Sequence, residues 1–332
     1  MVTLIEDIND LPLVSIICTV YNQESMINQT LESVFGQTYP HLELLIIDNG
    51  SRDASLKIIE NSLKRCPSHI PASVFIHPFT KNYCQSFNEV FLHAKGKYFI
   101  DLSGDDILMA DHINIAVKRL LEKPEAWAVF SNVLLFERER KTFSHFYQTT
   151  TESHIEEGNL YMSIVGGNPV LSVSLVVDTE KFKKEGMYDE HLVYEDFDMM
   201  VRMSRKYPLF YTGVVGVEKT IHQHSFSATQ YQARNSRMLP STYQVCRKIQ
   251  VLNQTAEEHQ ALIKRVSYEL KMAVVSGNFS VAEDFIQLGK EIGLSHVQLC
   301  WSQFVCWLRL DMSFILPFKE NLTFMRRKFT RQ

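Results

Sequence analysis

Short apolar runs alternate with amphipathic segments through the first two thirds of the chain, and this alternation constrains the fold more than any other feature. The run Leu13–Val20 lies between Pro12 and Asn22, is rich in β-branched residues and is apolar on both faces. The runs Leu42–Ile47 and Lys97–Leu102 have a similar character. Apolar residues on both faces are typical of strands buried inside a parallel sheet. These runs therefore predict central strands.

Segments with helical periodicity lie between the predicted strands. Glu24–Phe35 and Arg52–Cys66 both place apolar side chains three and four positions apart. Strands that alternate with helices imply right-handed crossovers and an open sheet covered on both sides. We therefore expect an α/β fold with a mainly parallel sheet flanked by helices. A further strand is expected at Leu171–Val177, after a turn at Gly166 and Gly167.

The pattern changes near Ala228, after which strand signals stop. Helical patterns follow at about 240–253, 256–276, 279–293 and 296–312, and Gly277 and Gly293 fall where helix ends are expected. The sequence thus predicts a main domain at residues 11–228, a helical extension at 229–312 and a basic amphipathic tail at 313–332.

The composition is that of a globular protein. The chain has 332 residues, of which 45% are apolar and 22% charged. Lys and Arg (34) nearly balance Asp and Glu (38), so no global positive field recruits nucleic acid. Six scattered cysteines contain no CxxC pair, and the first residues lack the layout of a secretion signal. No apolar run reaches about 18 residues. We expect free thiols, a cytoplasmic location and no membrane-spanning helix.

The last twenty residues combine positive charge with apolar side chains. Ser313–Gln332 carries five lysines and arginines and one acid, Glu320, which gives a net charge of +4. Aromatic residues are interleaved among them. Trp301, Phe304, Trp307 and Leu308 lie just upstream. This composition suits peripheral contact with an anionic membrane, at the inner face. A solvated basic tail behind a packed helix is the alternative, and the sequence leaves both open.

Polar segments follow the first, second and fourth predicted strands. They are Tyr21–Asn22, Asp48–Ser51 and Ser103–Asp106. In open α/β sheets, ligands bind beyond the carboxyl ends of the strands. The three segments together therefore predict a binding site at one sheet edge.

The third of these segments, Ser103-Gly104-Asp105-Asp106, predicts the most specific chemistry. Adjacent carboxylates on a turn can hold a hard divalent cation that bridges phosphates. The alternative is a helix N-cap, because aspartate favours that position. On this segment alone both interpretations stand.

Two later clusters also carry candidate groups. Glu195-Asp196-Phe197-Asp198 offers a general base for a hydroxyl, although acids in the first turn of a helix are also stabilised by its dipole. His222 and His224 offer a metal or phosphate contact, whereas a surface histidine usually serves neither purpose.

Five segments stand in a fixed order along residues 11–228. They are Val14–Asn22 (VSIICTVYN), Glu43–Asp53 (ELLIIDNGSRD), Ala94–Ile100 (AKGKYFI), Tyr194–Arg202 (YEDFDMMVR) and His222–Ser227 (HQHSFS). This set resembles the motifs of family 2 glycosyltransferases, which have the GT-A fold. The resemblance implies that residues 11–228 are a GT-A domain that uses a nucleotide-sugar.

The resemblance also implies roles for the matching positions. Asp196 is the expected catalytic base, and Asp105 and His222 are the expected contacts of Mg²⁺ or Mn²⁺ at the diphosphate. The donor would be held by Thr19, Tyr21, Glu24, Asp48, Ser103 and Asp106, with Asp48 at the uracil or ribose and Asp106 supporting Asp105.

Three positions depart from the family pattern. Ser103 stands where many members carry the first aspartate of the Asp-x-Asp motif, which leaves a metal fewer carboxylates. Thr19 replaces a common proline and Asn49 a common aspartate.

The resulting hypothesis is an inverting glycosyltransferase that moves a sugar from a UDP-sugar to the hydroxyl of a glycan or lipid-linked acceptor in surface polysaccharide or glycolipid synthesis. An inactive relative that binds nucleotide-sugar or glycan is the alternative, favoured by Ser103. A nucleotidyltransferase is a third class, but Leu13–Glu24 lacks the Gly-rich phosphate loop that it needs.

Overall fold

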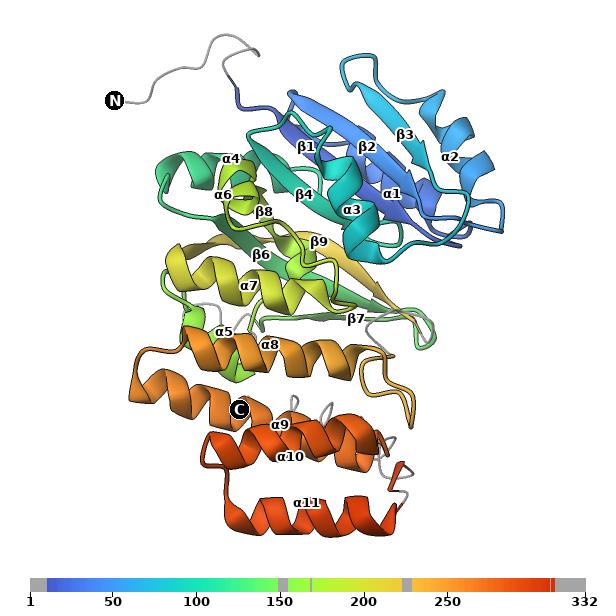
Figure 1. Ribbon diagram of the computed structural model, residues 1–332. Coiled ribbons are helices and arrows are strands. Elements are labelled where there is room, and N and C mark those ends of the chain that lie inside the picture. Colours follow the sequence, from blue (N-terminus) through green and yellow to red (C-terminus); the bar gives the residue numbers. More distant parts are fainter. Residues whose placement is uncertain (1–10, 149–154, 168, 223–228, 311, 314–332) are drawn as a thin grey trace. The chain divides into compact units, whose positions relative to one another are not determined.

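The computed structural model describes residues 11–148, 155–167, 169–222, 229–310 and 312–313 (Figure 1). The chain divides into two compact units, Met1–Tyr161 with Pro169–His222 and Met162–Asn168 with Gln223–Gln332. The predicted domain boundary at residue 228, and the predicted tail beyond Ser313, lie outside the described residues.

The first unit is built on a nine-stranded sheet of order β3-β2-β1-β4-β8-β6-β9-β5, in which β7 pairs with β6. The strands are β1 (Val14–Val20), β2 (Leu42–Asp48), β3 (Ala72–Ile76), β4 (Tyr98–Ser103), β5 (Ile107–Leu108), β6 (Ala128–Glu137), β7 (Thr142–His145), β8 (Val176–Asp178) and β9 (Leu209–Ile221). The helices that accompany them are α1 (Ile27–Phe35), α2 (Ser55–Leu63), α3 (Tyr83–Phe91), α4 (His112–Glu122), α6 (Thr179–Lys184) and α7 (Glu195–Lys206).

The sheet has a parallel half and a mixed half. Strands β3, β2, β1 and β4 are parallel to one another, as the alternating pattern predicts. Beyond β4, strand β8 is antiparallel to both β4 and β6, whereas β9 is parallel to β6. The predicted α/β fold class is therefore confirmed, and the sheet is more mixed than predicted.

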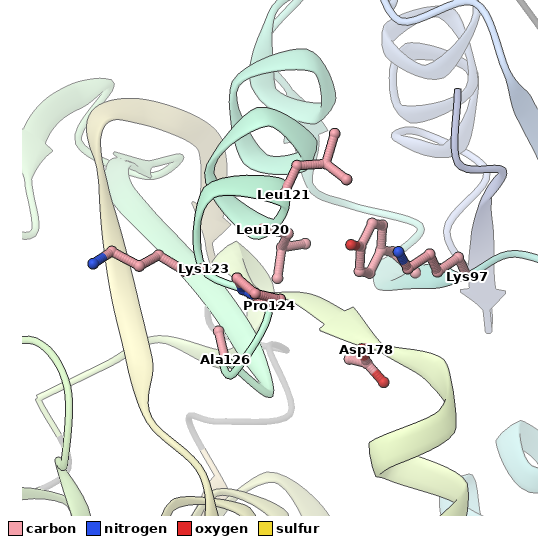
Figure 2. A pocket seen from close by; sticks show the side chains of 8 residues that line it. Lys97, Leu120, Leu121, Lys123, Pro124, Ala126 and Asp178 are labelled. Atoms are coloured by element: carbon pink, nitrogen blue, oxygen red, sulfur yellow. The ribbon is translucent and has the colours of Figure 1, made fainter. Parts of the chain in front are cut away.

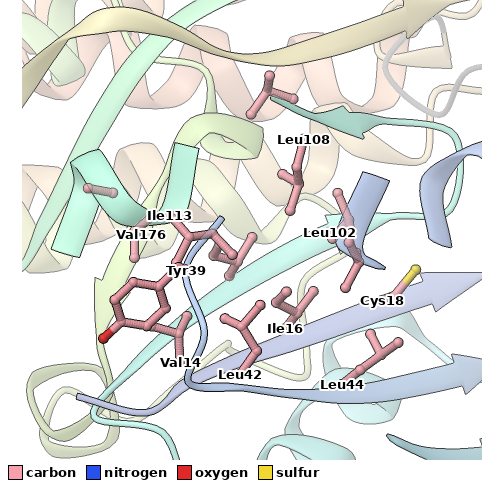
Figure 3. Close-up of a cluster of buried hydrophobic side chains, with 14 of the residues drawn as sticks. Val14, Ile16, Cys18, Tyr39, Leu42, Leu44, Leu102, Leu108, Ile113 and Val176 are labelled. Atoms are coloured by element: carbon pink, nitrogen blue, oxygen red, sulfur yellow. The ribbon is translucent and has the colours of Figure 1, made fainter. Parts of the chain in front are cut away.

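Apolar side chains from alternate strand positions form a core on one face of the sheet. Figure 3 shows Val14, Ile16 and Cys18 of β1 among these residues, with Leu42 and Leu44 of β2 beside them. Apolar residues of α1 and α4 belong to the same cluster. Burial of both strand faces explains why these runs are continuously apolar.

The opposite face carries an aromatic cluster. Phe87 and Phe91 of α3 pack against Phe99 of β4, with ring centroids 6.0 and 4.8 Å apart. Phe182 of α6 and Tyr188 join the same group. The cluster fixes α3 and α6 against β4, whose carboxyl end carries Ser103.

Two predicted boundaries are wrong for identifiable reasons. Helix α1 begins at Ile27 rather than at Glu24, because the backbone amides before it have other partners: that of Gln23 donates to Ser55 at the start of α2, and that of Glu24 to Asp53 in the loop after β2. The strand predicted at Leu171–Val177 is mostly a 3₁₀ turn, η3 (Ser172–Ser174), and only Val176–Asp178 is extended.

The second unit is helical, as the sequence beyond Ala228 predicts. It contains most of α5 (Tyr161–Gly167), together with α8 (Met238–Leu252), α9 (Ala256–Val275), α10 (Phe279–Glu291) and α11 (His296–Leu308) (Figure 1). Helix α9 starts with a capping box between Thr255 and Glu258. Its buried Glu269 pairs with Arg265 at 3.1 Å. No helix within the described ranges is both long and apolar enough to cross a bilayer.

Candidate active site

The carboxyl ends of β2, β1 and β4 meet at one edge of the sheet, where three predicted site residues align. Strand β1 pairs Val20 with Asp48 on one side and Thr19 with Ser103 on the other. Neighbouring strands lie about 4.8 Å apart, so Asp48 and Ser103 are separated by about 10 Å across the end of β1. The predicted gathering of polar strand ends is therefore present.

Hydrogen bonds tie the turn after β1 to the loop after β2. The backbone amide of Asn22 donates to Ser51 Oγ at 3.0 Å, and the amide of Arg52 donates to Asn22 Oδ1 at 2.8 Å. Glu24 Oε2 accepts from the amide of Ala54 at 2.8 Å. One oxygen of Glu24 thus holds the loop, and its predicted contact with a nucleotide remains a prediction.

Asp48, Thr19 and Tyr21 differ in their access to solvent. Asp48 is 2% exposed, and its Oδ1 accepts from the amide of Ser51 at 3.1 Å. Thr19 is 7% exposed, whereas Tyr21 is 46% exposed. Tyr21 therefore offers an open aromatic surface at this edge, and Asp48 is buried at the end of β2.

Asn49 has a structural explanation for its departure from the family's aspartate. Its amide nitrogen donates to the Lys81 carbonyl at 3.1 Å, and its amide oxygen accepts from the Lys81 backbone amide at 3.0 Å. A carboxylate accepts only, so an aspartate makes one of these two hydrogen bonds and not the other. Asn49 clamps the two loops together.

The turn after β4 is held against the end of β1. The amide of Gly104 donates to the Thr19 carbonyl at 3.0 Å. A Cβ atom on Gly104 would lie 2.5 Å from Gln23 Oε1 and 3.0 Å from Val20 Cγ2, so a larger residue there would displace the Gln23 side chain. Ser103 Oγ donates to Asp105 Oδ1 in a short hydrogen bond. Ser103 therefore orients the carboxylate that follows it.

Asp105 and His222 lie side by side, as the metal prediction requires. His222 follows β9, and its Nε2 is 3.2 Å from Asp105 Oδ2. Both side chains are mostly buried, at 12% exposure for Asp105 and 15% for His222. The pair joins the ends of β4 and β9 at the same edge of the sheet.

Asp106 is buried behind this pair and meets a lysine. Its Oδ1 accepts from the amide of Thr220 at 3.2 Å, and its Oδ2 lies 3.6 Å from Lys219 Nζ. Burial raises the pKa of Asp106 to about 7, although the positive charge of Lys219 opposes this rise. The pKa of Lys219 is raised chiefly by Asp106, and Asp105 and Asp196 act on it in the same direction.

Asp196 stands in the first turn of α7 and is oriented by a serine. Ser172 Oγ of η3 donates to Asp196 Oδ2 at 2.7 Å. The other oxygen, Oδ1, is buried and has no hydrogen-bond partner within the described residues. Burial raises the pKa of Asp196, and the Ser172 hydrogen bond opposes the rise. The carboxylate is thus fixed through one oxygen while the other is left to accept.

A second buried acid, Asp101, interacts with this region. Asp101 of β4 accepts hydrogen bonds from the hydroxyls of Tyr83 at 2.5 Å and Tyr188 at 2.7 Å. Burial raises its pKa to about 6, and the negative charge of Asp196 adds to the rise. The network therefore connects β4 with α3 through Tyr83, and with the segment after α6 through Tyr188.

Sequence reasoning missed three groups of this site. Lys219, Ser172 and Asp101 carry no motif, and their partners lie far away in the sequence. In the sequence of β4, Asp101 appears only as a polar residue that interrupts an apolar run. Lys219 stands between Glu218 and Thr220 in β9, so the strand's pattern does not single it out.

A small hollow elsewhere on the sheet does not belong to this site. Figure 2 shows it among Lys97, Leu120 and Asp178, with Lys123, Pro124 and Ala126 nearby. It lies at the amino end of β4, whereas the acids follow the carboxyl end of the same strand. The chemistry of the candidate site comes from its converging charges rather than from this hollow.

The residues fit a divalent cation that the substrate helps to hold. Mg²⁺ and Mn²⁺ are usually bound through one or two protein groups together with phosphates and water. Asp105 and His222 supply two donors of suitable type. Across the described ranges, no three His, Cys, Asp or Glu side chains form a complete metal site by themselves.

The sheet topology is that of the GT-A fold, and the acids lie beyond the carboxyl ends of its strands. Residues 15–173 match the family model described as Glycosyl transferase family 2. The matched residues make up a little under half of the chain, and this part belongs to the family.

The curated relatives agree with this assignment. An uncharacterized glycosyltransferase of Haemophilus influenzae is 27% identical over 174 residues, which cover 52% of this chain and 65% of the relative. A second one from the same organism is 21% identical over 301 residues and covers 85% of this chain and 92% of the relative. The alignments span just under two thirds of the length of the first three relatives.

Solved structures share the fold. S. aureus TarS, solved in complex with UDP-GlcNAc, has a TM-score of 0.67 and 16% identity over 89% of this chain and 88% of that chain. A mannosyltransferase from Pyrobaculum calidifontis, solved with GDP-Man and Mn²⁺, has a TM-score of 0.58 and 16% identity over 91% and 86% of the two chains.

Proposed function

We propose that this protein transfers a sugar from a nucleotide-sugar, with UDP as the leaving nucleotide, to an acceptor hydroxyl with inversion at the anomeric carbon. One observation carries the proposal. Asp105 and Asp106 follow β4, and Asp196 lies in the first turn of α7. The negative charges of these three acids all act on Lys219 of β9, so the three side chains lie around one region. A reaction that separates a diphosphate from a sugar needs charge control of this kind.

On the donor side, Asp105 and His222 would hold Mg²⁺ or Mn²⁺, with Ser103 orienting Asp105. The cation, when bound, supplies positive charge to the departing diphosphate. Asp48 and the exposed ring of Tyr21 would contact the nucleoside, because both follow strands at the same sheet edge. Thr19 and Glu24 would complete that end, and Asp106 would support Asp105.

On the acceptor side, Asp196 would take the proton of the attacking hydroxyl. Its Oδ2 is fixed by Ser172, which leaves the buried Oδ1 to accept the proton. Burial raises the pKa of this carboxyl, which makes its ionised form a stronger base. One base and one displacement are the requirements of an inverting reaction.

The experiment that tests this function measures nucleotide release. The full chain is incubated with UDP- and GDP-sugars, Mn²⁺ and candidate glycan acceptors, and free UDP or GDP is quantified. Release that depends on acceptor supports transfer. Tight UDP binding without release from any donor and acceptor would favour the alternative, a nucleotide-sugar or glycan-binding relative, for which the loss of an aspartate at Ser103 is the supporting observation.

We also propose that the acceptor is a growing glycan or lipid-linked chain, met by peripheral contact with the cytoplasmic face of a membrane. Helix α11 supports this contact, because its exposed side chains form an apolar face. Val297 and Trp307 are both 79% exposed, Trp301 56% and Phe304 49%. Tryptophan beside basic residues is typical of segments that lie at a bilayer surface. The basic sequence of residues 314–332 follows this helix directly.

Flotation with liposomes tests the membrane contact. The full chain should float with vesicles that contain phosphatidylglycerol and less with neutral vesicles or at high salt. The double variant Trp301→Ser, Trp307→Ser should lose flotation, whereas Val251→Ser, at an 85% exposed position of α8, should retain it. Equal flotation of all three proteins would overturn this proposal.

A further inference from the structure

Lys219 is a positive charge set among the acids of the candidate site. It lies on β9, three residues before His222, and its Nζ is 3.6 Å from Asp106 Oδ2. The pairing of Ile107 with Glu218 brings the turn after β4 beside this part of β9. The lysine is therefore fixed at the same sheet edge as Asp105.

The exposure of the two partners differs. The Asp106 side chain is 1% exposed, whereas the Lys219 side chain is 28% exposed. Asp106 also has a second partner, the amide of Thr220 at 3.2 Å. An ammonium group has three N–H donors, and one carboxylate oxygen uses at most part of them. Lys219 thus pairs with Asp106, and part of the lysine side chain is exposed to solvent.

The surrounding charges indicate a role for the exposed part of the Lys219 side chain. Asp105, Asp106 and Asp196 concentrate negative charge here, which would repel the diphosphate of a nucleotide-sugar. Lysine is a frequent binder of phosphate in proteins as a compact positive charge. An ammonium group between the acids and the solvent lowers the electrostatic cost of bringing the phosphates in.

We propose that Lys219 is a protein-borne cation of the donor site, which binds the diphosphate of the nucleotide directly and in addition to any metal held by Asp105 and His222. This inference rests on the proposed function. It adds a residue that no motif marks, and it assigns part of the donor affinity to a group that remains when divalent cations are removed.

A structural explanation competes with this proposal, because Lys219 also neutralises buried Asp106. Two substitutions separate the alternatives. Lys219→Met removes the charge but leaves Asp106 without its ion pair, so a lower Tm is expected. The double variant Asp106→Asn, Lys219→Met removes both charges, and the asparagine oxygen still accepts from Thr220. Its Tm should exceed that of Lys219→Met.

Calorimetric titration in EDTA provides the test, with UDP and uridine as probes. Lys219→Met should weaken UDP binding by about ten- to a hundredfold, the range for a hydrogen bond to a charged group, and leave uridine binding unchanged. Lys219→Arg should retain most of the UDP affinity. Lys271→Met, on the exposed side of α9, is the matched control and should bind as the unaltered chain does.

The double variant decides between ligand binding and structure. If Lys219 binds phosphate, the double variant binds UDP at least about tenfold more weakly than Asp106→Asn alone. Equal UDP affinity of these two variants would overturn the proposal, as would equal losses for UDP and uridine. If the unaltered chain binds UDP only when Mn²⁺ is present, the Lys219 proposal is overturned and the proposed function still stands. Absence of UDP and GDP binding with and without Mn²⁺ would overturn both.

Discussion

Ser172 donates a hydrogen bond of 2.7 Å to Oδ2 of Asp196 and thereby joins η3 to the first turn of α7. A hydrogen bond to the ionised form lowers the pKa of a carboxyl, and burial of Asp196 raises it. Ser172→Ala removes the lowering contribution only. The pKa of Asp196 should therefore rise further, and a higher pH is then needed to ionise the base.

The measurement is the pH profile of kcat/KM for sugar transfer. Its acid limb should move to higher pH in Ser172→Ala. Ser174→Ala is the control in the same turn, because Ser174 Oγ donates to the Leu171 carbonyl instead. An identical shift in both variants would indicate a disturbed η3 rather than an effect on Asp196.

Asp196→Asn should abolish most turnover while UDP binding persists. Asparagine keeps the shape and the hydrogen bond from Ser172 but takes no proton, and a general base typically contributes about 10²- to 10⁴-fold. Asp284→Asn on α10 exchanges the same groups at an exposed position and should leave kcat unchanged. If Asp196→Asn turns over like the unaltered chain, Asp196 is not the base.

Removal of divalent cations should reduce nucleotide release, and added Mn²⁺ should restore it. Asp105→Asn should raise the Mn²⁺ concentration needed for half-maximal rate, because one of two protein donors loses its charge. Turnover in EDTA that equals turnover in Mn²⁺ would contradict the assignment of a cation to Asp105 and His222.

Asp101 should make stability depend on pH in a defined window. Its pKa in the folded chain is about 6, against an ordinary value of 3.8, because of burial. Between about pH 4 and 6 the folded state then binds more protons than the unfolded state, so stability falls as pH rises and levels off above pH 6. Asp101→Asn should remove up to about 3 kcal/mol of this pH dependence.

Urea unfolding at a series of pH values between 4.5 and 7.5 measures the effect, with about one pH unit between steps. The asparagine oxygen can still accept from Tyr83, so the packing of the tyrosines is retained. Parallel pH curves for Asp101→Asn and the unaltered chain would show that Asp101 does not titrate in this window.

Gly50→Ala should lower the free energy of unfolding. The loss should be larger than the left-handed backbone conformation of Gly50 alone would cause. Gly50 has φ +80°, and a Cβ there would lie 2.6 Å from the backbone nitrogen of Thr80. Gly213, with φ +78°, has no atom within 4 Å of such a Cβ. Gly213→Ala should therefore cost only about 1–2 kcal/mol, and Gly50→Ala clearly more, in urea unfolding. Equal losses would contradict the close approach of Thr80.

The parallel half of the sheet was predictable because its strands are buried on both faces. Leu13–Val20 and Leu42–Ile47 are apolar except at Ser15, Thr19 and Glu43, and both are strands within one residue of the predicted bounds. The helical second unit was predictable from periodicity and from Gly277 and Gly293. Predicted helix ends were wrong where side chains from another segment accept hydrogen bonds from the backbone, as at Gln23 and Glu24.

The candidate site was predictable only where a motif exists. Asp105 and His222 are adjacent in space, as the family pattern implies. Lys219 pairs with Asp106 because β9 returns beside β5, and no local pattern records that return. Ser172 was hidden for another reason, since its segment reads as a strand and folds as a turn.

The double pairing of β1 has a consequence for how such proteins diverge. Because Thr19 is matched to Ser103 and Val20 to Asp48, one inserted residue in β1 would misalign the nucleoside end and the phosphate end together. New donor preferences are therefore expected to accumulate in the connecting loops, while this strand is inherited with its length unchanged.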